Sequence, residues 1–147
     1  MFLKDKHYYQ PKKITKMIEK ELPKSRTKGM LIETPIPKGW AVMLIDYLKQ
    51  LPEYTKIALI SAESGALRVY LSWAKGLATN IDLRRRVEVE KGFIYDVIDK
   101  IEDASRTLCM VTSESGRMVP SIKDEKSYVL CEEWQKKLNK YDGVEEE

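Results

Sequence analysis

The sequence has few of the residues that most often carry out chemistry. Its 147 residues include two cysteines and one histidine, and the histidine lies at position 7. The body of the chain therefore gives no support for a Ser-His-Asp or Cys-His catalytic arrangement. A Walker A loop and a G-x-G-x-x-G fingerprint are also missing from the sequence. These absences favour a non-enzymatic protein, and we expect neither a cofactor nor catalytic residues.

Long apolar runs are missing as well. No segment reaches the ~20 consecutive apolar residues that a membrane span needs. The opening stretch, MFLKDKHYYQPKK, has no apolar signal core, so we expect an untargeted, cytoplasmic protein without a membrane partner. In such a reducing compartment a disulfide between Cys109 and Cys131 could form, but it is not the expected state.

Charge is plentiful but unevenly distributed. The net charge is +3, yet residues 1–28 hold nine Lys or Arg against three Asp or Glu, a balance of +6. The remaining residues therefore sum to −3. A basic N-terminal segment on an otherwise mildly acidic chain can bind an anionic partner such as nucleic acid, a nucleotide or an acidic protein face. Lysines that solvate an exposed helix are the commoner explanation.

Hydrophobic residues make up 43% of the chain, which is enough for a single domain over residues 1–147. The sequence first predicts an extended arm anchored by its tyrosines (1–10), a helix begun by Pro11 and ended by Pro23, a loop (24–29), an extended segment (30–39) and a helix (40–51). It then predicts a hairpin (55–62 and 66–73), a long helix, a second hairpin around 121–126, a helix from about 131 to 141 and a disordered acidic tail (142–147).

The long helix, from Thr79 to Arg106, admits a second interpretation. Thr79 and Asp82 have capping-box spacing, and Arg84–Glu88 and Arg86–Glu90 would be i,i+4 ion pairs. A glycine in the middle weakens the helix, however, so residues 86–90 could instead form a short strand.

Both cysteines lie in the stretch TLCMVTSESGRMVPSIKDEKSYVLCEEW (107–134), whose plan matches a zinc treble clef. A treble clef takes two ligands from a C-x2-C knuckle and two from the first turn of the helix after the next hairpin. Thr112 and Trp134 occupy the second and fourth ligand positions here, and neither is a normal zinc ligand. A site completed by His7 would need the arm to fold back across the chain, which we do not expect. The spacing therefore predicts a metal-free, treble-clef-like block.

These elements predict an α+β fold in which antiparallel β-hairpins pack with about four helices and end in the treble-clef-like block. We divide the domain into a basic N-terminal arm and helix (1–28), a helix-hairpin-helix core (29–106), a degenerate zinc-knuckle block (107–141) and the tail (142–147).

Four stretches of the chain resemble a family of small phage and prophage proteins, mostly of uncharacterised function. The family core reads approximately GW…L…(I/V)KEKFGGLRFY…helix…TCxxCGxPG…LCxxH. The matching stretches here are GWAVMLIDYL (39–48), SAESGALRVY (61–70), TLCMVTSESGRM (107–118) and VLCEEW (129–134). The resemblance covers roughly residues 39–134 and implies a common fold for that part of the chain.

The chain departs from the family pattern at the zinc ligands, where it has Thr112 and Trp134, and at the lysines of the hairpin motif, where it has Ser61 and Glu63. The resemblance then implies a member that has lost the metal and kept the fold, with Trp134 filling the space of the metal. It implies no activity. Phage accessory proteins of this size often counter host defence, which suggests an inhibitor or a sequestering protein.

Basic residues near an aromatic side chain are the strongest candidates for a binding site. Guanidinium groups match phosphate oxygens, and aromatic rings stack on bases. Six residues are predicted to bind an anionic ligand on these grounds: Lys56, Arg68, Tyr70, Arg84, Arg85 and Arg117. Arg68 leads the set because the family's hairpin motif keeps an arginine there. Ordinary ion pairing is the alternative explanation for these arginines.

Three functions fit these observations. The first is a small, non-enzymatic, phage-type binding protein that sequesters an anionic nucleotide or inhibits a host protein, in the host cytoplasm if a phage encodes it. The second is a nucleic-acid-associated protein that uses the basic residues 1–28. The third is a metal-dependent phosphate hydrolase that uses three carboxylates of the long helix, Asp96, Asp99 and Asp103, although a solvated helix face explains them better. A homodimer through Trp40, Trp73 and the tyrosines also fits, but core packing explains these residues as well.

Overall fold

The structure of the chain is a computed structural model that describes residues 1–63, 65–73 and 79–144. Its helices are α1 (Pro11–Glu21), α2 (Lys24–Thr27), α3 (Ala41–Gln50), α4 (Ile81–Thr107) and α5 (Glu132–Asp142), with 3-10 turns η1 (Asp5–His7) and η2 (Lys38–Trp40). Its strands are β1 (Tyr8–Tyr9), β2 (Leu31–Ile32), β3 (Ile36–Pro37), β4 (Thr55–Glu63), β5 (Ala66–Trp73), β6 (Arg117–Ser121) and β7 (Lys126–Leu130). The predicted α+β fold is confirmed.

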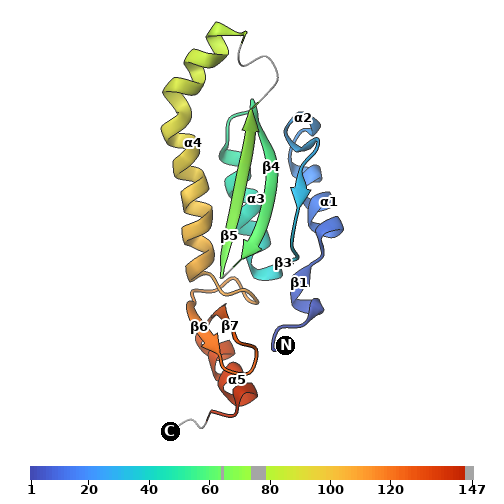
Figure 1. The fold of residues 1–147 in the computed structure, drawn as a ribbon, viewed down its shortest axis with the longest axis vertical. Helices are drawn as coiled ribbons and strands as arrows, with labels where there is room; N and C mark the ends of the chain where they lie inside the picture. Colours follow the sequence, from blue (N-terminus) through green and yellow to red (C-terminus); the bar gives the residue numbers. More distant parts are fainter. Residues whose placement is uncertain (64, 74–78, 145–147) are drawn as a thin grey trace.

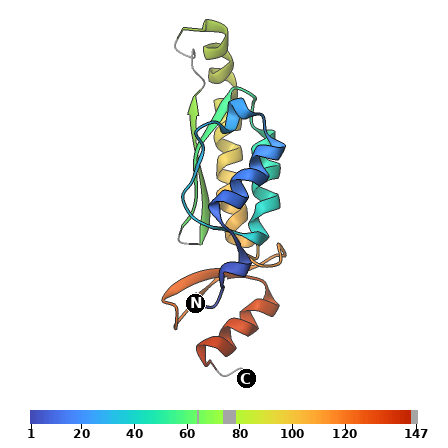
Figure 2. The same ribbon diagram turned by 90° about the vertical axis from the view of Figure 1, so that its right-hand side faces the viewer.

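The molecule is elongated, with a three-stranded sheet and its helices at one end and the β6–β7 hairpin with α5 at the other (Figure 1). In the larger sheet the strand order is β2-β4-β5, with β2 parallel to β4 and β4 antiparallel to β5. Helices α1, α3 and α4 lie on one face of this sheet, and the other face carries none of the described helices (Figure 2). Function can therefore be sought on the uncovered face and at the junction between the two ends.

The core lies between the sheet and its helices, because alternate strand residues point toward the helices. On β5, Leu67 and Val69 are buried whereas Arg68 is exposed, which is the alternation of a strand with one face on the core. The facing core side chains include Ile14, Ile18, Leu44, Leu48, Ile57, Ile60, Ile94, Val97 and Ile101. Burial of each such side chain stabilises the fold by roughly 1.5–3 kcal/mol. Trp40 belongs to this core at 1% exposure, so it offers no surface for a homodimer.

Residues 24–29 begin with the short helix α2, so the prediction of a loop there was wrong. The cause is Arg26, which is only 4% exposed. Its guanidinium donates hydrogen bonds to the carbonyl oxygens of Leu48, at 3.0 Å, and Thr55, at 3.2 Å. These carbonyl oxygens lie near the end of α3 and at the start of β4. At such ends of helices and strands, backbone acceptors need hydrogen-bond donors from elsewhere in the chain. The buried side chain of Arg26 thus links α2 to α3 and to β4.

Helix α4 continues through residues 86–90, which excludes the alternative of a strand there. Its N-cap is Asn80, so the prediction of Thr79 as the cap was wrong by one residue. The Asn80 side-chain oxygen accepts a hydrogen bond from the Leu83 N–H at 3.0 Å. Asparagine is among the best N-cap residues because its short side chain reaches the free backbone N–H groups of the first turn.

Arg86 fastens α4 to the loop before β4. The predicted Arg86–Glu90 pair forms at 3.0 Å, and the same guanidinium pairs with both carboxylate oxygens of Glu53. The other predicted pair does not form as expected, because Glu88 pairs with Lys91 at 2.8 Å instead of with Arg84. An i,i+3 lysine is an equally close neighbour on a helix surface, so spacing alone did not distinguish the two partners.

The C-terminal block has the predicted order of knuckle, hairpin and helix, and α5 begins directly after Cys131. The block is held against the rest of the molecule at η2. There the Gly39 N–H donates to the Met110 carbonyl at 2.8 Å, and Trp40 Nε1 donates to the Leu108 carbonyl at 2.8 Å. The Gly39-Trp40 segment and the segment from Leu108 to Met110, which are far apart in the sequence, therefore meet in space.

The tail begins later than predicted, because Asp142 still belongs to α5. Its carboxylate accepts a hydrogen bond from the Ser121 hydroxyl at 2.9 Å, which joins α5 to the β6–β7 turn. Gly143 then ends the helix with a φ of 76°, a left-handed conformation that glycine adopts without strain. The rest of the predicted tail, residues 145–147, lies outside the described residues.

Candidate ligand-binding site

Three of the predicted anion-binding residues, Lys56, Arg68 and Tyr70, share the uncovered face of the β4–β5 hairpin. Arg68 already has a partner, because its Nε lies 3.7 Å from a carboxylate oxygen of Glu102 on α4. The cleft beside it measures only about 140 Å³. The charge of the Arg68 guanidinium on this face is therefore partly neutralised.

The other three predicted residues lie elsewhere. Arg84 and Arg85 are exposed near the start of α4, and neither forms an ion pair within the part of the chain that the structure describes. Arg117 lies on β6, where its Nε donates a hydrogen bond to the Gln135 side chain at 3.0 Å. One anion could not contact all six predicted residues together.

The two cysteines are free and buried, and hydrogen bonds satisfy their sulfurs. The Thr112 hydroxyl donates to Cys131 Sγ at 3.7 Å. Burial favours the neutral thiol of Cys109, but hydrogen bonds from the Thr112 side chain and from nearby backbone N–H groups outweigh burial and lower the pKa of Cys109. Over residues 1–63, 65–73 and 79–144, no group of three or more His, Cys, Asp or Glu side chains could hold a metal ion.

Trp134, at the fourth ligand position, contacts the N-terminal arm. Its ring lies edge-on to those of Phe2 and His7, with ring centroids 5.9 and 5.3 Å away. The arm therefore does fold back onto the C-terminal block, contrary to our expectation. The reason is apolar burial, since Phe2 also packs against Tyr128 and Tyr141 at 5.7 and 5.4 Å.

Asp124, in the turn between β6 and β7, fastens the arm. Its carboxylate accepts hydrogen bonds of 2.6 Å from the Phe2 N–H and from the hydroxyls of Tyr128 and Tyr141. Burial opposes ionisation, but these hydrogen bonds outweigh burial and lower the pKa of Asp124 to about 2. The carboxylate thus stays charged at neutral pH and holds the start of the arm.

The folded-back arm encloses a cavity of about 330 Å³ against the β4–β5 turn and β7. Its apolar walls include Met1, Leu3, Trp40 and Met110, and its polar groups include Asp5, Tyr8 and Lys126. Mostly apolar walls with a few polar groups, at a volume of roughly 300–1,000 Å³, are typical of small-molecule sites. This cavity is the best candidate for a ligand site.

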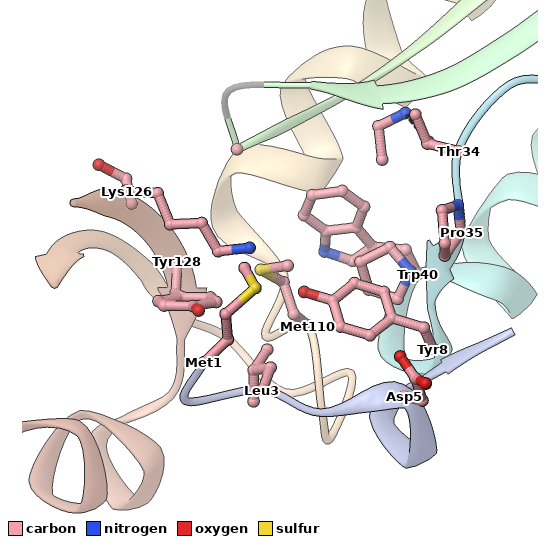
Figure 3. Close-up of a pocket in the computed structure, with 14 residues that line it drawn as sticks. Met1, Leu3, Asp5, Tyr8, Thr34, Pro35, Trp40, Met110, Lys126 and Tyr128 are labelled. Carbon is pink, nitrogen blue, oxygen red and sulfur yellow. Dashed lines mark hydrogen bonds between the residues drawn. The ribbon is translucent and has the colours of Figure 1, made fainter. Parts of the chain in front are cut away.

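Two polar side chains reach into the cavity from opposite walls, Lys126 from β7 and Tyr8 from β1 (Figure 3). Partial burial lowers the pKa of Lys126 despite the nearby charge of Asp124. Burial, and then Asp124, raises the pKa of Tyr8. The cavity therefore brings together the amino group of Lys126 and the hydroxyl group of Tyr8, and the carboxyl group of Asp5 also lines it. Among the described residues, no carboxylate forms an ion pair with Lys126 within 4.0 Å.

No pattern in the sequence indicates this cavity. Tyr8 and Lys126 lie at opposite ends of the chain, and no periodicity relates them. The one relevant signal was the cluster of aromatic residues in the arm, from which we expected Tyr8 to be an anchor. Which residues lie next to Tyr8 depends on how the arm folds back. Only the three-dimensional structure reveals that.

Comparisons with protein-family models, with curated proteins and with solved structures found no match to this chain. Within the described residues, no helix is long and apolar enough to cross a membrane. Function is therefore inferred from the cavity and the surfaces of the chain itself.

Proposed function

We propose that the chain is a non-enzymatic binding protein whose cavity sequesters a small anionic molecule with an aromatic or apolar body. The observation that carries this proposal is the ammonium of Lys126, which reaches into a mostly apolar cavity without an ion-pair partner among the described residues. Desolvating a cation is costly, and an anionic group beside it offsets that cost. The Tyr8 hydroxyl on the opposite wall can donate a second hydrogen bond.

The dimensions of the cavity favour a nucleoside monophosphate over a larger nucleotide. A volume of about 330 Å³ lies near the lower limit for small-molecule sites. Tyr8 is the partly exposed aromatic residue of its walls, and an aromatic ring suits a base, whereas the rings of Trp40 and Tyr128 are buried behind the wall at 1% and 0% exposure. In the phage setting that the family resemblance implies, the protein would act in the host cytoplasm and withhold such a nucleotide from a host defence system.

Isothermal titration calorimetry with a panel of nucleoside monophosphates tests this function. We expect at least one of them to bind, and Lys126→Met to weaken that binding on the order of tenfold by removing the cation. Lys123→Met is the matched control, because Lys123 lies in the turn just before β7, over the Tyr141 ring and outside the cavity. Absence of binding by the whole panel, or equal affinity of Lys126→Met and wild type, would refute the proposal.

Nucleic-acid binding is the second candidate function, and a basic surface beside Trp134 favours it. Partial burial, followed by the charges of Lys6, Lys38 and Lys137, lowers the pKa of His7, so three cations converge on this ring. Lys137 also lies over the Trp134 ring at 4.2 Å. Cations beside an aromatic ring suit the phosphates and bases of a single strand. Retention of single-stranded RNA at low salt, with steep loss on added salt, would support this function; no retention at low salt would remove it.

A further inference from the structure

Asp5 brings a negative charge to the cavity, opposite in sign to that of Lys126. It lies in η1, on the wall that the arm contributes, and it is exposed, so a ligand can reach it. Two hydrogen bonds close this turn: the His7 N–H donates to the Lys4 carbonyl at 2.8 Å, and the Lys4 N–H donates to His7 Nδ1 at 3.2 Å. The Asp5 carboxylate itself forms no hydrogen bond or ion pair within the part of the chain that the structure describes. The turn therefore fixes the position of a carboxylate whose acceptor sites are free.

Asp5 and Lys126 line the same cavity but do not pair with each other. Figure 3 shows them apart, with the Tyr8 side chain between them and its hydroxyl directed toward Lys126. The Lys126 amino group lies over the Tyr128 ring, 5.0 Å from the ring centroid, and this contact favours its position on the β7 side. A ligand that fills the space between the two charges therefore needs an anionic group at one end and hydrogen-bond donors at the other to match both.

The bases differ in the donors that they can offer to such a carboxylate, which only accepts hydrogen bonds. Guanine has two adjacent donors on its pairing edge, the ring N–H and the 2-amino group, and these can bond to the two oxygens of one carboxylate. Adenine and cytosine have an amino group beside an unprotonated ring nitrogen, and uracil has one N–H between two carbonyl oxygens. Each of these three bases sets a lone pair against the carboxylate, so guanine is the common base that fits Asp5 best.

We propose that the cavity selects guanosine monophosphate, with Asp5 bound to the base and Lys126 bound to the phosphate. This inference rests on the proposed function, because it requires a nucleoside monophosphate in the cavity. Tyr8 is partly exposed and lies between the two charges, so its ring can stack on the base while its hydroxyl donates a hydrogen bond on the phosphate side. Asp5 then determines the specificity for the base, whereas Lys126 contributes to the affinity for every nucleoside monophosphate.

Isothermal titration calorimetry with guanosine, inosine, adenosine and uridine monophosphates measures this selectivity. We expect guanosine monophosphate to bind tightest, and inosine monophosphate, which lacks the 2-amino group, to bind more weakly on the order of tenfold. Asp5→Asn should lower the affinity for guanosine monophosphate on the order of tenfold or more, and should not weaken uridine monophosphate. The same variant should gain affinity for xanthosine monophosphate, whose 2-carbonyl oxygen can accept a hydrogen bond from an amide but is repelled by a carboxylate.

Asp99→Asn is the control, because it removes the same charge from an exposed position on α4 outside the cavity and should leave every affinity unchanged. Lys126→Met should weaken all four nucleotides alike, which separates the two roles. If no nucleoside monophosphate binds, the proposed function fails and this inference fails with it. If they bind and Lys126→Met weakens them, but guanosine monophosphate is not preferred or Asp5→Asn weakens all of them equally, the function stands and the role of Asp5 is overturned.

Discussion

The backbone N–H of Gly39 donates a hydrogen bond of 2.8 Å to the carbonyl oxygen of Met110, and this contact joins the two ends of the molecule. The Ser113 hydroxyl adds a second bond, of 2.6 Å, to the carbonyl oxygen of Gly39. A Cβ on residue 39 would overlap the backbone of Cys109 and Met110. Absence of a side chain is therefore what allows η2 and the knuckle to approach each other, and it gives a physical reason for a Gly-Trp motif to accompany this knuckle.

Gly39→Ala should lower the free energy of unfolding by about 2–4 kcal/mol, because the added methyl group meets two backbone segments that cannot both move away. Urea unfolding followed by circular dichroism, at low protein concentration, measures this change. Gly92→Ala is the matched control. It lies in an exposed helix with open space around it, so we expect a gain of up to about 1 kcal/mol from helix propensity. Equal effects of the two substitutions would contradict this account of Gly39.

Much of the fold could be predicted from the sequence, because burial follows a simple period in most elements. The alternation along β5 and the proline that begins α1 gave both elements at nearly their observed bounds. The prediction failed over residues 24–29 because α2 depends on Arg26. The carbonyl oxygens that accept hydrogen bonds from this buried guanidinium belong to α3 and β4, which are distant from α2 in the sequence. No local sequence pattern therefore indicates them.

Arg26→Met should lower the free energy of unfolding by about 2–3 kcal/mol, since it removes the buried hydrogen bonds from the guanidinium to the carbonyl oxygens of Leu48 and Thr55. Thermal and urea unfolding of the variant measure the loss. Lys24→Met, an exposed change in the same helix, should alter stability by only about 0.5 kcal/mol. If the two variants lose stability equally, the buried hydrogen bonds of Arg26 are not what holds α2.

The candidate site was less predictable than the fold. Arg68 and Tyr70, two residues apart on β5, lie together on one exposed face, as the period of a strand requires. The cavity, however, exists only because the arm crosses to the C-terminal block, where Asp124 holds it. A lone aspartate in a Lys- and Glu-rich turn looks like an ordinary surface charge in the sequence, so its three donors could not have been inferred.

Stability should fall in acid because of Asp124. Its pKa is about 2 in the folded chain against an ordinary value of 3.8, so its contribution is complete above the ordinary pKa. That contribution is lost as the pH falls through about 4 toward about 2, when the folded carboxylate is protonated. Asp124→Asn should therefore unfold at a lower temperature than wild type at neutral pH, and the difference should shrink below about pH 3.

Thermal unfolding across this pH range measures the Asp124 effect, and proteolysis of the arm provides a second readout. The arm of Asp124→Asn should be cleaved faster, because the Phe2 N–H and two tyrosine hydroxyls lose a charged acceptor. Asp99→Asn is the control, since Asp99 is exposed on α4 and far from the arm. A constant stability difference between Asp124→Asn and wild type at every pH would show that the carboxylate charge is not involved.

A zinc site should be recoverable in the C-terminal block if the block is a treble clef without its metal. The knuckle, hairpin and helix follow in the required order, and backbone N–H groups already point to the Cys109 sulfur. Thr112→Cys with Trp134→His would complete the four ligands that structural zinc needs. Native mass spectrometry should then find one zinc ion per chain, and a chelator should lower the unfolding temperature of this double variant.

The control is Thr112→Ser with Trp134→Phe, which supplies no new zinc ligand and should therefore bind no zinc. If the first double variant folds without taking up zinc, the treble-clef interpretation of this block is wrong, and Cys109 and Cys131 are simply buried core residues.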